Sequence, residues 1–127
     1  MRTESKRQKQ VSEVIRRHFG LVLIQEGQNI YGDALVTVTN VKVSPDFGLA
    51  KIYLSIYNTE DKQEVIRLME QQIHNLRSEL ARRIRKHVRK IPMIDIYEDE
   101  TLDEMYRLEA LFKEIKKQDA AVRGEEE

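Results

Sequence analysis

The chain has 127 residues, which is the size of one ordinary domain with a modest hydrophobic core. Its 22 basic residues balance 22 acidic ones, and the absence of cysteine excludes disulfides and thiolate chemistry. No apolar run approaches the roughly 20 residues of a membrane span, and the first ten residues lack the apolar region of a signal peptide. We therefore expect a cytoplasmic protein that does not enter a membrane.

The charges are gathered into blocks along the chain. Residues 1–18 carry six basic and two acidic residues, and residues 76–92 carry seven basic residues and one acidic residue. Residues 94–109 reverse the balance, with seven acidic residues and one basic residue. The two basic blocks are therefore candidates for contact with a polyanion, although the formal net charge is zero.

The first predicted element is an amphipathic helix with apolar residues at spacings of three and four. Its apolar side holds Val11, Val14, Ile15, His18, Phe19 and Val22. Gly20 interrupts this helix only weakly. The polar, glycine-bearing residues 26–33 predict a loop before the next element.

A β-hairpin is predicted next. Residues 35–43 alternate, and Asn40 interrupts the phase, which indicates a β-bulge. Pro45 and Gly48 predict the turn, with Gly48 supplying a positive φ. Residues 49–57 alternate again, and their buried side is expected to hold Ala50, Ile52, Leu54 and Ile56.

Residues 62–90 predict a helical region that begins at a cap formed by Asp61 and Glu64. It is too long to be straight, so we expect a bend near His74 and Asn75. Pro92 ends it. Residues 93–97 predict a third strand, and a capping box at 101–104 predicts a last helix through Ile115. We expect one domain over residues 1–117 and a disordered tail over 118–127.

Several patterns suggest catalysis or metal binding, but each has a simpler explanation. Asp46-Phe47-Gly48 spells the magnesium motif of protein kinases, yet the chain is too short and lacks every other kinase motif. His18 and His87 are expected on apolar helix sectors and His74 at the bend, and none of them has a nucleophile in a recognisable motif. The carboxylates of Asp95, Glu98, Asp99 and Asp103 could hold a hard cation, but a helix cap and the helix dipole explain residues 99–104 better. The sequence thus predicts no catalytic residue, no metal and no cofactor.

The basic residues of the second block lie on the side of the predicted helix opposite its apolar sector. Six of them follow one another without an acid between Glu79 and Asp95, and contact with phosphates would relieve their repulsion. A solvated surface, or neutralisation by the acidic last helix, remains open. Tyr53 and Tyr57 could stack on bases or pack under a helix. The predicted RNA-binding residues are Arg82, Arg83, Arg85, Lys86, Arg89 and Lys90, with a second surface at Lys6, Arg7, Lys9, Arg16 and Arg17.

The order helix, strand, strand, helix pair, strand is similar to the type II KH arrangement, an α+β fold with a three-stranded sheet covered by helices. Over residues 6–115 the chain resembles the ribosome-binding factor A family. The most specific part is Val43-Ser44-Pro45-Asp46 followed by Ala50-Lys51-Ile52-Tyr53. Further matching stretches are Arg7-Gln8 with Val11 and Ile15, and residues 36–46, 50–56, 76–80 and 89–92.

The chain departs from the family at one place. The family often shows an Ala-x-Gly kink, and Gln72-Ile73-His74 stands there. The resemblance implies a bend at this segment. The missing Gly-x-x-Gly loop argues against the usual single-strand clamp of KH domains.

The resemblance implies a monomeric, non-enzymatic assembly factor that binds the small (30S) ribosomal subunit and its 16S rRNA late in maturation, with no small-molecule substrate. Two alternatives remain. One is a protein-interaction adaptor whose acidic C-terminal helix docks a basic partner. The other, less favoured, is a small metal-dependent nuclease that uses Asp95 and Asp99.

Overall fold

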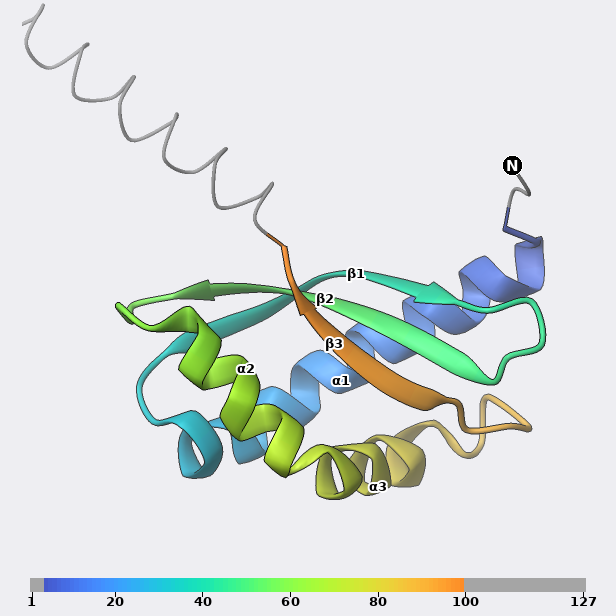
Figure 1. Cartoon of the computed structure of the whole chain (residues 1–127). Coiled ribbons are helices and arrows are strands. Elements are labelled where there is room, and N and C mark those ends of the chain that lie inside the picture. Colours follow the sequence, from blue (N-terminus) through green and yellow to red (C-terminus); the bar gives the residue numbers. More distant parts are fainter. Residues whose placement is uncertain (1–3, 100–127) are drawn as a thin grey trace, which may run out of the picture.

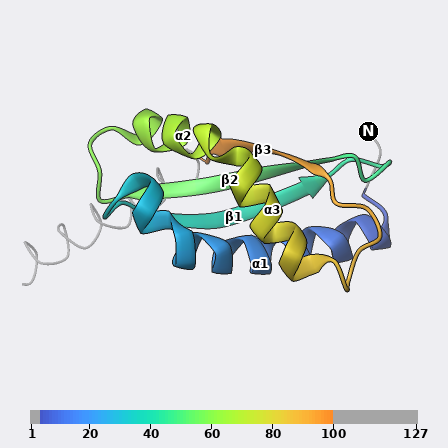
Figure 2. The same cartoon turned by 90° about the horizontal axis from the view of Figure 1, so that it is seen from below.

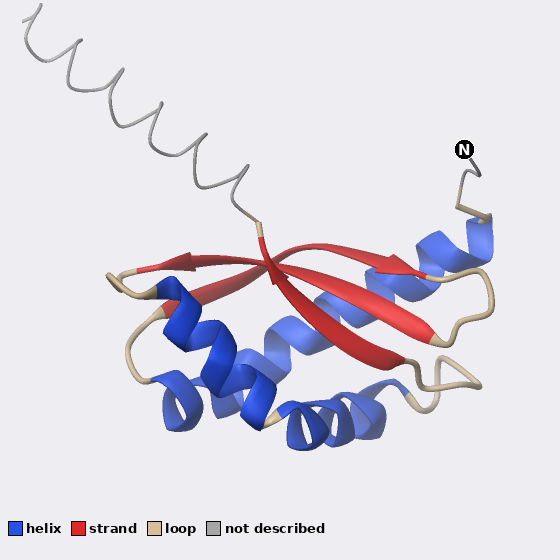
Figure 3. Cartoon of the chain, viewed as in Figure 1, coloured by secondary structure: helices blue, strands red, loops and turns tan. Residues whose placement is uncertain are grey.

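The computed structural model describes residues 4–99, which form three helices and one three-stranded sheet (Figures 1 and 3). The elements are α1 (Lys6–Tyr31), β1 (Leu35–Val43), β2 (Leu49–Tyr57), α2 (Lys62–Gln71), α3 (Ile73–Ile84) and β3 (Met93–Glu98). The predicted last helix and the predicted tail lie outside the described residues. Within residues 4–99, no helix is long and apolar enough to span a bilayer.

The sheet is mixed and has β2 at its centre. β1 pairs with β2 antiparallel, and β2 pairs with β3 parallel. The register shifts between Val38 and Asn40, which confirms the predicted bulge. All three helices lie on one face of the sheet, as Figures 1 and 2 show from two directions. The predicted α+β, KH-like arrangement is confirmed.

The core lies between the sheet and the helices. The four predicted inward residues of β2, Ala50, Ile52, Leu54 and Ile56, are buried. Phe19 and Ile15 of α1 pack into the same core as Leu80 of α3. One buried polar residue, Gln8, fastens α1 to the sheet, because its amide donates to the carbonyl of Val43 at 2.9 Å.

Helix α1 is longer at its C-terminal end than the sequence predicted. Its start is a capping box in which the Ser5 hydroxyl accepts from the Gln8 N–H and the Gln8 side chain accepts from the Ser5 N–H. The predicted loop over residues 26–33 is wrong, since the helix continues to Tyr31. The Tyr31 side chain lies where a Cβ on Gly27 would be, so packing offsets the low helix propensity of this glycine.

The predicted helical region over residues 62–90 is divided and shorter. The chain breaks at Gln72, which confirms the expected bend slightly ahead of His74. Helix α3 ends at Ile84, so the prediction of a helix reaching Lys90 is wrong. Residues 85–92 instead turn back toward the sheet, and Arg77 holds this return by donating to the carbonyls of Ile91 at 2.9 Å and Pro92 at 3.0 Å.

The turn between β1 and β2 also differs in one detail. The positive φ belongs to Phe47, at 58°, whereas Gly48 was predicted to supply it. The turn is closed because the Ser44 N–H donates to the Leu49 carbonyl at 2.8 Å and the Phe47 N–H donates to the Ser44 carbonyl at 2.9 Å. A Cβ on Gly48 would lie 3.2 Å from the carboxylate oxygens of Asp46, a tight contact that a side chain there could relieve only by shifting this carboxylate.

Candidate nucleic-acid interface

Three segments that are distant in the sequence meet at one end of the molecule. They are the first turns of α1, the β1–β2 turn at residues 44–48, and the return at residues 85–92 (Figures 1 and 2). A backbone hydrogen bond joins the return to the turn, since the Met93 N–H donates to the Gly48 carbonyl at 2.9 Å. Between the segments lies a pocket of about 360 Å³. Its lining residues are Arg7, Val11, Asp46, Phe47, Val88, Arg89 and Lys90.

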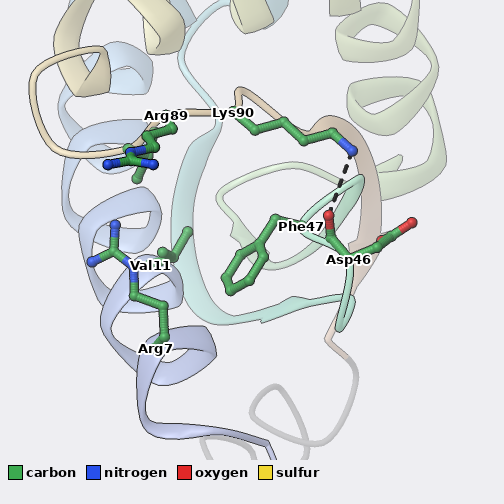
Figure 4. Close-up of a pocket in the computed structure, with 7 residues that line it drawn as sticks. Arg7, Val11, Asp46, Phe47, Arg89 and Lys90 are labelled. Atoms are coloured by element: carbon green, nitrogen blue, oxygen red, sulfur yellow. Dashed lines mark hydrogen bonds between the residues drawn. The ribbon is translucent and has the colours of Figure 1, made fainter.

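Arg7 connects the two basic blocks of the sequence. Its guanidinium donates to the carbonyl of His87 at 3.3 Å, across 80 positions of the chain. Lys90 in turn donates to the backbone carbonyl of Asp46 at 3.4 Å (Figure 4). Arg7, Arg89 and Lys90 therefore line the same pocket, although the sequence assigned them to separate surfaces.

The basic surface continues along α1 to a pair of histidines. The rings of His18 and His87 lie 5.7 Å apart between centroids. Burial is the main cause of a lowered pKa at His18, and the nearby His87, Arg17 and Arg83 lower it further. These effects place Arg17 of α1 and Arg83 of α3 around the same ring. We call the set Arg7, Arg17, Arg83, Arg89 and Lys90 the cationic surface.

Two of the predicted RNA-binding residues form ion pairs with glutamates of their own helices. Arg16 pairs with Glu13 at 2.8 Å, and Arg82 pairs with Glu79 at 3.1 Å. Arg82 and Arg83 also lie in the last turn of α3, where a cation favours the helix itself. The remaining four predicted residues, Lys6, Lys9, Arg85 and Lys86, are exposed. Because residues 85–90 are not helical, the six basic residues of this block do not form one helix face.

The acid at the pocket, Asp46, is hydrogen-bonded within its turn and lies close enough to Lys90 for that cation to lower the pKa of its carboxylate as well. The Asp46 carboxylate accepts from the Ser44 hydroxyl at 2.7 Å and from the Gly48 N–H at 3.0 Å. The first of these bonds is the main cause of a lowered pKa at Asp46, so the carboxylate stays ionised. Figure 4 shows its side chain directed away from the pocket, whereas the Phe47 ring points from the turn toward α1.

Sequence reasoning missed the roles of Phe47, Val88 and His87 at this end of the molecule. It treated residues 46–48 only as a turn and placed His87 on an apolar helix sector, which is wrong because His87 is exposed in the return. The Ser44-Pro45-Asp46 turn was visible in the sequence. The pairing of that turn with residues 85–92 was not, because it depends on where α3 ends.

The remaining candidates have structural contacts. Tyr53 stacks on Tyr97 with ring centroids 5.5 Å apart, so its partner is a neighbouring strand rather than a helix. The Asp99 carboxylate accepts from the Thr39 hydroxyl at 2.7 Å. Among residues 4–99, no three His, Asp or Glu side chains gather in a way that could hold a metal.

These observations define a small KH-like domain whose one end carries a basic surface around an apolar pocket. Residues 7–112 match the model of the family described as Ribosome-binding factor A. The chain belongs to the ribosome-binding factor A family.

Known proteins are similar over most of the chain. A ribosome-binding factor A from Chlorobium phaeobacteroides is 33% identical over 113 residues, which cover 88% of this chain and 96% of that protein. The crystal structure of ribosome-binding factor A from Thermus thermophilus superposes with a TM-score of 0.59 at 18% identity, covering 72% of this chain and 94% of that one.

A second Thermus thermophilus structure is a homology model of ribosome-binding factor A fitted into the cryo-EM map of a complex with the 30S subunit. It superposes with a TM-score of 0.51 at 20% identity and covers 75% of this chain and 93% of that one. At these identities the two structures support the fold.

Proposed function

We propose that this protein is a non-enzymatic assembly factor that binds the small ribosomal subunit and its 16S rRNA late in maturation. Membership of the ribosome-binding factor A family supports this function. So does the Thermus thermophilus relative, which is described in a complex with the 30S subunit.

One observation carries the assignment of the binding surface. The hydrogen bond from the Arg7 guanidinium to the His87 carbonyl joins the two basic blocks. Cations from both blocks therefore surround one pocket. Cations gathered in this way repel one another, and binding to phosphates relieves the repulsion and releases counterions from the RNA. A chain with no formal net charge can therefore still bind a polyanion through one end.

The proposed contact residues differ in how readily they could reach a phosphate. The cationic surface forms the centre, and the exposed Lys6, Lys9, Arg85 and Lys86 extend it. Arg16 and Arg82 would first have to leave Glu13 and Glu79. Pairs as exposed as these contribute little to stability, so breaking them costs little.

A factor of this kind needs no chemistry of its own. It acts by binding one conformational state of the subunit better than another, which shifts the population toward that state. We propose a cytoplasmic location because the partner is the ribosome, and a single domain over residues 1–117.

The function is tested by cosedimentation of the full-length protein with purified small subunits over a series of salt concentrations. We expect binding at low salt that weakens steeply as salt rises. The double variant Arg85→Glu with Arg89→Glu should bind more weakly by on the order of tenfold or more, because it replaces two attractions by two repulsions.

A matched control is the double variant Lys42→Glu with Lys51→Glu. These exposed lysines face each other across β1 and β2, and they point away from the helices. The control makes the same change in net charge, so it should bind like the wild type. Absence of wild-type binding at low salt would contradict the proposed function. Binding like that of the wild type by both double variants would instead favour the adaptor, which docks through another surface.

A further inference from the structure

The pocket at the cationic end has an apolar floor that contact with phosphates does not require. Val11 and Val88 are buried members of the core, and Phe47 packs against the same core. The three cations Arg7, Arg89 and Lys90 line the rest of the pocket. A ligand that fits both parts has a flat apolar portion and an anionic portion.

We propose that this pocket receives one unpaired nucleotide of RNA, with its base against Phe47 and its phosphates at Arg7, Arg89 and Lys90. The inference rests on the proposed function, because it names the form of RNA that this surface takes. Stacking of a base on an aromatic ring beside cations that hold the backbone is a general mode of binding single strands.

The backbone holds the Phe47 ring in place for this role. A φ of 58° is unfavourable for a bulky residue, and it is maintained by the closed hydrogen bonds of the turn. Figure 4 shows the ring directed toward α1, where the Arg7 and Arg89 side chains lie. Phe47 is half-buried and packs against the core, and it also lines the pocket.

The electrostatics favour an anion inside the pocket. Among the described residues that line it, the one acid is Asp46, whose carboxylate is hydrogen-bonded to Ser44 and Gly48 and points away, although Lys90 is near enough to lower its pKa. Lys90 is oriented by its bond to the Asp46 carbonyl, and Arg7 by its bond to the His87 carbonyl. The volume of about 360 Å³ lies in the range of pockets that take small ligands.

The pocket is separate from the position at which KH domains carry their loop. That position corresponds to the break between α2 and α3 at Gln72, which lines a different pocket together with Glu26 and Arg82. A double helix could contact the cationic surface but could not insert a base into the floor. The proposal therefore predicts a preference for unpaired RNA over duplex RNA.

The first test is photocrosslinking of the full-length protein to a short single-stranded RNA that contains 4-thiouridine, with the attached residue found by mass spectrometry. We expect attachment at Phe47 or at Val88. Attachment confined to residues outside the pocket would overturn the inference.

The second test compares Phe47→Asn with Phe47→Tyr. Asparagine tolerates a positive φ, so the turn is retained without the ring, whereas tyrosine retains the ring. Unfolding midpoints of both variants confirm that they fold. Phe47→Asn should weaken binding of the same single-stranded RNA by roughly five- to 150-fold, which is the loss expected for one stacked base. Phe47→Tyr should stay within about twofold of the wild type, and binding of duplex RNA should be equal for all three.

The outcomes separate this inference from the function on which it rests. If wild type and Phe47→Asn bind small subunits and single-stranded RNA equally, the inference fails and the proposed function stands. If the wild type does not bind subunits at all, the proposed function fails. A third outcome is that the protein binds an acidic peptide with one phenylalanine, that this binding depends on Phe47, and that RNA does not bind. This outcome would overturn the inference in favour of a protein ligand.

Discussion

At the scale of single residues, His18 is a titratable group with positive neighbours on several sides. Its ring faces His87 from the return and lies near Arg17 of α1 and Arg83 of α3. Its buried Nδ1 finds no hydrogen-bond partner among residues 4–99. Burial first, and then these positive neighbours, lower the pKa of His18, because both disfavour a positive charge at the ring.

This environment predicts that the protein loses stability in mild acid. Above the ordinary histidine pKa of about 6.5, the ring is neutral in the folded and unfolded states, and its titration has no effect. As the pH falls below that value, the unfolded chain takes up the proton first, so the free energy of unfolding decreases. The decrease stops once the pH is below the lowered pKa of the folded state. Urea unfolding at a series of pH values from neutral to mildly acidic measures it.

The variant His18→Gln should make this part of the pH dependence smaller, since it removes the titrating ring. His74→Gln is the control, because His74 is exposed at the start of α3 and away from the histidine pair. It should keep the wild-type dependence. A pH profile of His18→Gln that matches the wild type would show that other groups cause the loss.

Phe47 shows the limit of prediction for a single residue. The sequence placed a turn at residues 44–48 correctly, because Pro45 and Gly48 are local signals. It assigned the positive φ to Gly48, which is the residue with the least cost there, and the assignment was wrong. The hydrogen bonds of the turn and the packing of the ring on the core decide the conformation, and the local turn signals do not encode that packing.

At the scale of elements, the strands were easier to predict than the helix ends. The alternation in β2 and the phase change at Asn40 are local patterns, so the buried side and the bulge were both predicted correctly. The end of α3 at Ile84 has no glycine and no proline to mark it. It is set by the need to return the chain to β3, which Arg77 stabilises from a distance of 14 and 15 positions.

Helix α1 offers a direct test of how propensity and packing combine. Gly20 lies in its interior, and a Cβ there would meet nothing within 4 Å. Gly20→Ala should therefore raise the free energy of unfolding by about 0.5–1 kcal/mol, because alanine loses less backbone entropy in a helix. Chemical denaturation measures the change.

Gly32 provides the matched control at the end of the same helix. It also has open space around its Cα, but its φ of 76° disfavours any L side chain. Gly32→Ala should lower the free energy of unfolding. If both alanine variants change stability in the same direction, the conformational argument is wrong.

At the scale of the whole molecule, opposite charges cancel in number but not in position. The basic blocks were visible in the sequence as charge runs, and so was their suitability for a polyanion. That the two basic blocks lie side by side was not predictable. Their proximity depends at once on the length of α1, on the early end of α3 and on the path of residues 85–92 back to the sheet. The pocket is a product of this topology, whereas the cations that line it come from the two blocks.

The separation of charge predicts a salt dependence that the net charge of zero would not suggest. The measured quantity is the slope of log K against log salt for binding to small subunits. In Arg89→Gln this slope should become less steep by about 0.9 if the arginine neutralises one phosphate of a double helix. If the phosphate belongs to a single strand, the change should be about 0.7. Lys51→Gln removes the same charge from the sheet face opposite the helices, where no contact is proposed. It should leave the slope unchanged. Cosedimentation between about 50 and 200 mM salt measures both slopes. Equal slopes for the two variants would mean that the RNA responds to the total charge of the protein and not to its cationic end.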